Sequence, residues 1–148
     1  MGTPTKAKAS KGTKVQRGDG GGVEVFTTIG EVLSFEGPGE ETESIDVTNF
    51  DSTAKEFIST GLPDGGEVTF DVNFVGSDTQ QQGLRDDLRN GTLRNFKVIL
   101  NDHTVTPTTF SFSAVVTGLK GPSAGQGEQY KMSITLKVSG QATVSYSP

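Results

Sequence analysis

Four segments in which apolar and polar residues alternate constrain the fold of this chain most tightly. They cover residues 68–74, 96–100, 110–116 and 132–138. Successive side chains of a β-strand point to opposite faces, so each segment predicts a strand with one apolar and one polar face. Strands of this kind in a single small chain predict a mainly β fold, an antiparallel sandwich or barrel. Weaker strand signals lie at residues 23–35, 44–49 and 141–146.

One segment predicts a short flanking α-helix at about residues 78–90. Ser77-Asp78 offers an N-cap, Leu84 and Leu88 lie four residues apart, and Asn90-Gly91 forms a C-terminal stop. The residues between them predict a polar outer face of the helix: Gln80, Gln81, Gln82, Arg85, Asp86, Asp87 and Arg89.

The first 22 residues predict a flexible, basic N-terminal arm, followed by a sandwich domain at 23–148. The segment 1–22 is rich in Thr, Lys, Ser and Gly and has too few apolar side chains to form a core. Five basic groups against Asp19 give it a charge of +4, so the other 126 residues carry −9 of the total −5. Such an arm could bind nucleic acid, contact the acidic body of a neighbouring copy, or serve as a solvated tail.

Two further segments predict loops. Residues 37–66 begin with Gly37-Pro38-Gly39 and contain one short strand signal near Ile45. Residues 118–129 join the last two strong strands and include three glycines and a proline beyond Gly118. Loops longer than about 12 residues in a compact domain tend to be functional or disordered, so the 37–66 loop is a candidate contact region.

The residue types present disfavour catalysis and metal binding. The chain has no Cys and a single His, His103, which is expected in an exposed turn. A catalytic nucleophile usually needs a neighbouring base, and zinc needs three or four suitable ligands, so we expect no catalytic residues, no metal and no cofactor. No run reaches the roughly 18 apolar residues of a membrane-spanning helix, so we expect no membrane insertion.

Several segments, in order, resemble the lambda-like major tail tube proteins of long-tailed phages. They are Gly12–Asp19, Phe26–Val32, Gly37–Gly39, Ile45–Thr48, Lys55–Ile58 with Gly61-Leu62, Gly66–Val68, Gly91–Phe96 and Ser133–Gly140. The resemblance implies a sandwich whose copies form rings of six that stack into a hollow, genome-conducting tube. It also implies a virion location, synthesis in the host cytoplasm, non-specific passage of DNA, and tape measure, tail tip and tail terminator proteins as partners.

The resemblance and the charges together suggest two sets of functional residues. The N-terminal arm and the long loop are expected to contact neighbouring subunits through Lys6, Lys8, Lys11, Lys14, Arg17, Gly37, Pro38, Gly39, Glu40, Glu41, Glu43 and Phe57. Asp71, on the polar face of a strong strand, is the best single candidate for a lumen residue, because carboxylates repel DNA phosphates. The alternative for Asp71 is that it is an ordinary exposed strand residue. The alternative is a monomeric β-sandwich binding or adhesion module, although the chain offers only Tyr130 and Tyr146 and no Trp for a stacking platform.

Overall fold

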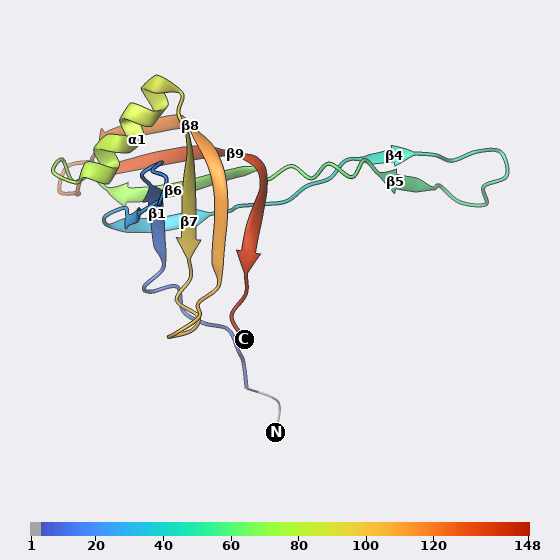
Figure 1. Cartoon of the computed structure of the whole chain (residues 1–148), viewed down its shortest axis with the longest axis horizontal. Coiled ribbons are helices and arrows are strands. Elements are labelled where there is room, and N and C mark those ends of the chain that lie inside the picture. The colour runs from blue at the N-terminus through green and yellow to red at the C-terminus, as the bar shows by residue number, and fades with distance from the viewer. Residues whose placement is uncertain (1–3) are drawn as a thin grey trace.

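The computed structural model describes residues 4–148, which form a bent antiparallel sheet, one helix and a projecting hairpin (Figure 1). The seven strands of the sheet lie in the order β2-β1-β7-β8-β9-β6-β3. Their bounds are β1 Lys14–Gly18, β2 Phe26–Thr28, β3 Val32–Glu36, β6 Glu67–Asn73, β7 Leu93–Ile99, β8 Thr109–Ser123 and β9 Lys131–Ser145. The hairpin contains β4 Ser44–Asp46 and β5 Phe57–Ser59, and helix α1 spans Thr79–Asn90.

Strands β8 and β9 are long enough to run through both layers of the bent sheet. β7 pairs with Thr109–Val115 of β8, whereas β6 pairs with Lys131–Lys137 of β9. Between β8 and β9 the register shifts three times, and irregularities of this kind bend strands and increase their twist. Layer 1 therefore consists of β2, β1 and β7 with the first half of β8 and the second half of β9. Layer 2 consists of the remaining halves with β6 and β3.

The core lies between the two layers, as the alternating segments predict. Layer 1 contributes Val15, Phe96, Val98, Phe112 and Ala114, and layer 2 contributes Val68, Phe70, Val72, Ile134 and Leu136. Phe96 and Phe112 stack with ring centroids 6.0 Å apart. The predicted antiparallel sandwich with one flanking helix is confirmed.

The helix begins and ends at the residues that the sequence indicates. The Asp78 side chain accepts a hydrogen bond from Gln80 N, and Gly91 ends the helix with a φ of 64°. That left-handed conformation is one that glycine adopts without steric cost. Leu84 is buried and Leu88 is partly buried against the core. Gln81 and Asp87, expected on the outer face, are instead buried.

Two further expectations differ from the structure. Residues 14–18, expected within a flexible arm, form β1 between β2 and β7, and Val15 is fully buried there. Residues 118–123, expected in a loop, continue β8 along β9. β8 tolerates Gly118, Gly121 and Pro122 because beyond Val115 it is hydrogen-bonded on one side only, and proline is accepted at sheet edges.

Candidate assembly surfaces

Residues 37–66 form an arm that projects away from the sandwich (Figure 1). β3 leads into the arm and β6 leads out of it. At its root Gly37 has a φ of 94°, and a Cβ there would lie 2.5 Å from the Glu67 carbonyl oxygen, so only glycine fits. β4 and β5 form a two-stranded ribbon in which Ile45 lies opposite Ile58 and Asp46 opposite Phe57.

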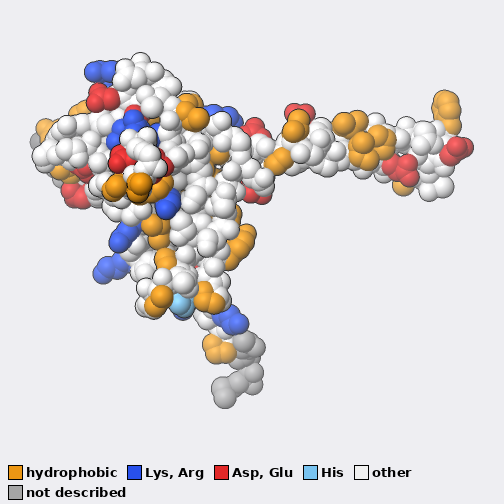
Figure 2. Space-filling view, in the orientation of Figure 1, with side chains coloured by type: hydrophobic (Ala, Val, Ile, Leu, Met, Phe, Trp, Pro, Cys, Tyr) orange, Lys and Arg blue, Asp and Glu red, His pale blue; other side chains and the backbone are white. Residues whose placement is uncertain are grey.

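The arm is both apolar and acidic at its surface. Hydrophobic side chains lie along its length and at its tip (Figure 2). The exposed ones are Ile45, Val47, Phe50, Phe57, Ile58 and Leu62. Seven carboxylates against Lys55 give residues 37–66 a charge of −6, so most of the acidity expected on the body lies on this arm. An exposed patch that combines apolar and charged groups is typical of a protein interaction site.

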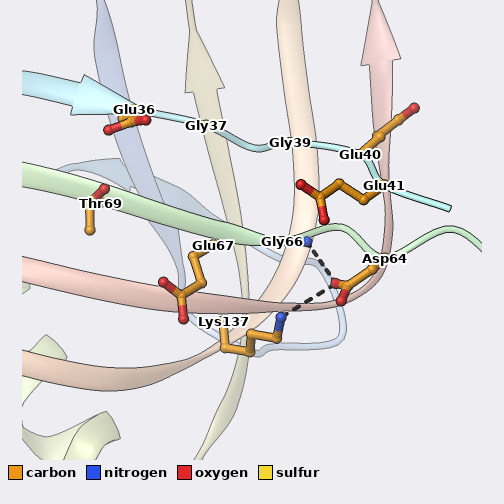
Figure 3. A pocket seen from close by; sticks show the side chains of 10 residues that line it. All are labelled: Glu36, Gly37, Gly39, Glu40, Glu41, Asp64, Gly66, Glu67, Thr69 and Lys137. Atoms are coloured by element: carbon orange, nitrogen blue, oxygen red, sulfur yellow. Dashed lines mark hydrogen bonds and ion pairs between the residues drawn. The ribbon is translucent and has the colours of Figure 1, made fainter. Parts of the chain in front are cut away.

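An open cleft of about 630 Å³ lies at the root of the arm (Figure 3). Its carboxylates are Glu36, Glu40, Glu41, Asp64 and Glu67, and Lys137 is its basic residue. Asp64 accepts hydrogen bonds from Gly66 N (2.8 Å) and from Lys137 Nζ (3.3 Å). These two donors lower the pKa of Asp64, the Gly66 amide more than the lysine. Gly37, Gly39, Glu40 and Glu41, which the sequence indicates as contact residues, therefore share one cleft.

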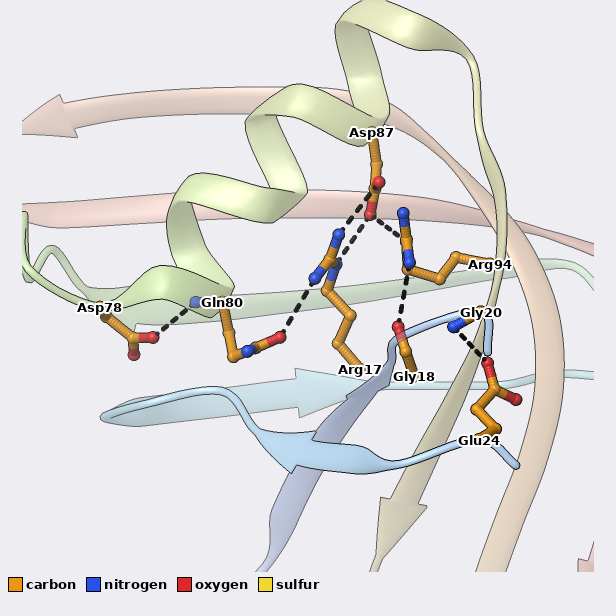
Figure 4. A network of polar contacts seen from close by, with 8 residues as sticks. All are labelled: Arg17, Gly18, Gly20, Glu24, Asp78, Gln80, Asp87 and Arg94. Atoms are coloured by element: carbon orange, nitrogen blue, oxygen red, sulfur yellow. Dashed lines mark hydrogen bonds and ion pairs between the residues drawn. The ribbon is translucent and has the colours of Figure 1, made fainter. Parts of the chain in front are cut away.

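The N-terminal lysines remain available for a partner, whereas Arg17 does not. Lys6, Lys8, Lys11 and Lys14 are exposed, and within residues 4–148 none of them forms an ion pair. The first three residues of the expected arm lie outside the described residues. Arg17 points inward from β1 and forms an ion pair with Asp87 of α1 (2.8 Å, Figure 4). Its expected role as an inter-subunit contact is replaced by a bond within the chain.

The cluster of Arg17, Asp87 and Arg94 is a feature that sequence reasoning missed. Asp87 accepts from Nε of both arginines at 2.8 Å, and its side chain is only 3% exposed. Arg94 also donates to the Gly18 carbonyl oxygen (3.2 Å), and Arg17 donates to Gln80 Oε1 (3.2 Å). The absence of a side chain at Gly83 makes room for the Arg17 guanidinium, since a Cβ there would lie 2.7 Å from Cζ. The cluster thereby joins β1 and β7 to the helix.

Asp71 lies on the outer face of layer 2. It is exposed, and its carboxylate accepts hydrogen bonds from Ser133 Oγ (2.6 Å) and Ser34 Oγ (3.3 Å). The residues around it on β3, β6 and β9 are polar: Ser34, Glu36, Thr69, Ser133 and Thr135. This face carries a carboxylate in a fixed position among hydroxyl groups.

Layer 2 has an open edge on each side. β3 is hydrogen-bonded to β6 alone at the end of the sheet order. On the opposite side, residues 116–123 of β8 lie beyond the part that pairs with β7. Arg85 Nη2 donates to the Gly121 carbonyl oxygen there (3.2 Å). Unpaired backbone groups at sheet edges can hydrogen-bond a further strand, so both edges can add one from another chain.

The described residues do not assemble a metal-binding cluster. His103 Nδ1 accepts from the amides of Val105 and Thr106, which fixes the turn between β7 and β8. Within residues 4–148 no three His, Cys, Asp or Glu side chains converge as metal ligands. Over the same range no helix is long and apolar enough to cross a membrane.

Solved structures of tail and tube proteins share this sandwich. The tail of an empty gene transfer agent particle with C6 symmetry matches 96% of the chain and 100% of its own chain at a TM-score of 0.73 and 19% identity. The sheath/tube terminator of an extracellular contractile injection system matches 94% and 96% of the two chains at 0.73 and 16%. The SPP1 tail tube matches 91% and 78% at 0.63 and 12%.

The sequence assigns the family. The profile described as "Phage tail tube, TTP, lambda-like" matches residues 6–135. The chain therefore belongs to the lambda-like phage tail tube family and is a structural component of a phage tail. No curated protein sequence matches it.

Proposed function

We propose that copies of this chain close into six-membered rings, which stack into a hollow tube through which the phage genome passes. The observation that carries the proposal is the pair of open edges of layer 2, at β3 and at residues 116–123 of β8. Pairing of β3 in one copy with β8 in the next is a head-to-tail contact, and such a contact makes a ring when its rotation closes. The C6 symmetry of the gene transfer agent tail supports a ring of six.

We infer that ring closure in this way turns the outer face of layer 2, and with it Asp71, toward the channel, because the other face of layer 2 packs against layer 1. We infer that Asp71 is a lumen residue whose charge repels DNA phosphates. Replacing Asp71 by Lys should make assembled tubes retain double-stranded DNA at low salt, because each phosphate contact adds salt-dependent affinity. Co-sedimentation of DNA with tubes measures this, and Asp86→Lys on the exposed side of α1 is the control with the same charge change. Equal DNA binding by the two variants would contradict the lumen assignment.

The tube needs further proteins that the chain itself does not supply. We propose a tape measure protein inside the tube, and tail tip and tail terminator proteins at its ends. The subunit would be made in the cytoplasm of the bacterial host and would act without catalysis. The absence of catalysis that we propose is supported by the single histidine, His103, whose Nδ1 accepts hydrogen bonds within a turn.

Electron microscopy of the concentrated, purified protein tests the proposal directly. Uniform rings or hollow tubes, with native mass spectrometry giving six chains in the smallest closed particle, are the expected result. A protein that stays monomeric at every concentration, and also in the presence of a tail tip complex, would contradict it.

A monomeric sugar-binding module has little support from the surface. Tyr130 and Tyr146 are both exposed, but they flank opposite ends of the 15-residue strand β9. A stacking platform for a sugar needs aromatic rings that lie close together. The two tyrosines do not provide one.

A further inference from the structure

The outer face of layer 2 separates negative from positive charge by strand. The outward charged residues of β3 and β6 are carboxylates: Glu36, Glu67 and Asp71. Those of β8 and β9 in this layer are lysines: Lys120, Lys131 and Lys137. In β6 and β9 these residues alternate with buried apolar ones, so their side chains point away from the core. One side of this face is therefore acidic and the other side is basic.

Two of the three lysines have no acidic partner within residues 4–148. Lys137 forms an ion pair with Asp64 at the root of the arm (3.3 Å), whereas Lys120 and Lys131 form none over that range. Both are exposed, and their cross-strand neighbours between β8 and β9 are serines. Their ammonium groups are available to an anion from outside the chain.

Asp71 lies too far from Lys120 to cancel its charge. The two residues share one row across the face, in which Asp71 is opposite Ser133 and Ser133 is opposite Lys120. Neighbouring strands are about 4.8 Å apart, so two spacings separate β6 from β8 by about 10 Å. That distance exceeds the Debye length of about 8 Å at physiological ionic strength. A phosphate beside Lys120 is consequently attracted more strongly than Asp71 repels it.

The two free lysines fit a phosphodiester backbone. Lys131 lies two residues from Ser133, the cross-strand neighbour of Lys120, so the two lysines are diagonal neighbours on adjacent strands. Double-stranded DNA carries one negative charge per roughly 1.7 Å of its axis, and each lysine that neutralises a phosphate adds salt-dependent affinity. A closed ring would repeat this pair of charges in every subunit around the channel.

We propose that Lys120 and Lys131 form a basic stripe on the channel wall that binds the phosphates of the passing DNA duplex weakly. The inference rests on the proposed function, which turns this face toward the channel. It adds an attractive element to a wall on which Asp71 is repulsive. Because each subunit presents both signs to the duplex, the net affinity stays low and the DNA can move.

Tubes of the Asp71→Asn variant test the stripe, because they lose the repulsive charge and keep both lysines. They should retain a short DNA duplex at low salt in a co-sedimentation assay. Adding Lys120→Gln and Lys131→Gln together should weaken that retention about tenfold, and each alone should weaken it less. The matched control in the same background is Lys97→Gln, which removes one positive charge from the outer face of layer 1 and should leave retention unchanged.

Amine labelling gives a second readout that needs no lysine substitution. Assembled tubes, unmodified or Asp71→Asn, react with an amine-specific reagent with and without the duplex, and peptide mass spectrometry gives the labelling rates. DNA should slow the labelling of Lys120 and Lys131 and leave that of Lys97 unchanged.

Retention that the lysine substitutions leave unchanged would overturn the inference, and so would Asp71→Asn tubes that retain no DNA. Equal labelling of Lys120 and Lys131 with and without DNA would overturn it as well. In each of these cases uniform tubes in electron micrographs would leave the proposed function standing. If the unmodified chain forms no rings or tubes at all, both proposals fail together.

Discussion

Asp87 shows how one buried carboxylate fixes the position of three elements. It lies near the C-terminal end of α1, where the helix dipole disfavours a negative charge, and two arginines from β1 and β7 offset that cost. Their side chains are 12% and 17% exposed, so they are largely shielded from water. Without Asp87, two positive charges would remain side by side with no carboxylate between them.

Asp87→Asn should lower the free energy of unfolding by about 3 kcal/mol, the lower end of the range for breaking a buried ion pair. Urea denaturation of the dispersed subunit measures this. The matched control is Asp86→Asn, at the exposed neighbouring position, which should stay within about 0.5 kcal/mol of the unmodified protein. A loss as small as that of the control would mean that the cluster adds no net stability.

Asp102 ties the chain terminus to the turn between β7 and β8. Its carboxylate accepts from Thr108 Oγ1 (2.6 Å), Thr108 N (2.8 Å) and Ser147 Oγ (3.0 Å). Hydrogen bonds from the Thr108 side chain and backbone, with that of Ser147, lower the pKa of Asp102 from 3.8 to about 2. Folding favours the ionised form, so the stabilising contribution is complete above pH 3.8 and is lost as the pH falls toward 2.

The amide resonance of Thr108 should therefore titrate with a midpoint near pH 2 in NMR spectra of the dispersed subunit. Asp102→Asn should abolish the titration and weaken the attachment of Ser147, because an amide cannot replace the ionised acceptor. A midpoint close to the ordinary value of 3.8 would show that these hydrogen bonds do not favour the charged form.

At the scale of elements, β1 divides the N-terminal segment into two structurally different parts. Residues 4–13 lie outside the sandwich, whereas Lys14–Gly18 pair with β2 and with β7. Removal of the first part takes away exposed lysines. Removal of the second part takes away a strand inside layer 1 together with the buried Val15 and Arg17.

Deletion of residues 1–13 should leave a folded subunit with a cooperative thermal transition but impaired assembly. Deletion of residues 1–18 should prevent folding, since β2 and β7 would lose their shared neighbour. Circular dichroism and thermal melting distinguish the two outcomes. A folded subunit after the longer deletion would show that β1 is dispensable for the sandwich.

The elements differ in how well the sequence predicts them. Strands β6, β8 and β9 follow from alternation because each has three or more buried apolar positions at intervals of two, such as Val68, Phe70 and Val72. β7 has two such positions, Phe96 and Val98. β1 has Val15 as its one buried hydrophobic side chain, so it gives no periodic signal. The helix follows from its caps, Asp78 and Gly91, although not from its buried polar residues.

The sequence predicts one of the candidate sites and not another, for a related reason. The 37–66 arm was found because its length and composition are properties of the local sequence. The cluster of Arg17, Asp87 and Arg94 was not, because Arg17 and Asp87 are 70 residues apart and each alone looks like a surface residue. Ion pairs of this kind depend on the tertiary fold, which no spacing rule supplies.

At the scale of the whole molecule, charge is separated onto two exposed segments. Residues 1–22 carry +4 and the arm carries −6, and within residues 4–148 one ion pair, between Asp64 and Lys137, neutralises part of the arm. Attraction between such segments on different copies is screened by salt, because the Debye length falls from roughly 10 Å at 0.1 M to roughly 3 Å at 1 M.

The concentration needed for tubes should consequently rise with ionic strength, as sedimentation across a salt series can measure. A variant with Lys6, Lys8 and Lys11 all changed to Gln should assemble less readily at low salt and respond less to added salt. Identical salt curves for the two proteins would show that the N-terminal lysines play no part in assembly.

The position of β9 also determines when a newly made chain can complete its sandwich. β9 is the last strand along the sequence, yet it lies between β8 and β6 in the sheet. While β9 is still inside the ribosome, β3 and β6 have no link to the rest of the sheet. The arm is synthesised before β9, but the sandwich that carries it is completed only after β9 has left the ribosome, so a shorter nascent chain lacks the folded body on which the proposed assembly depends.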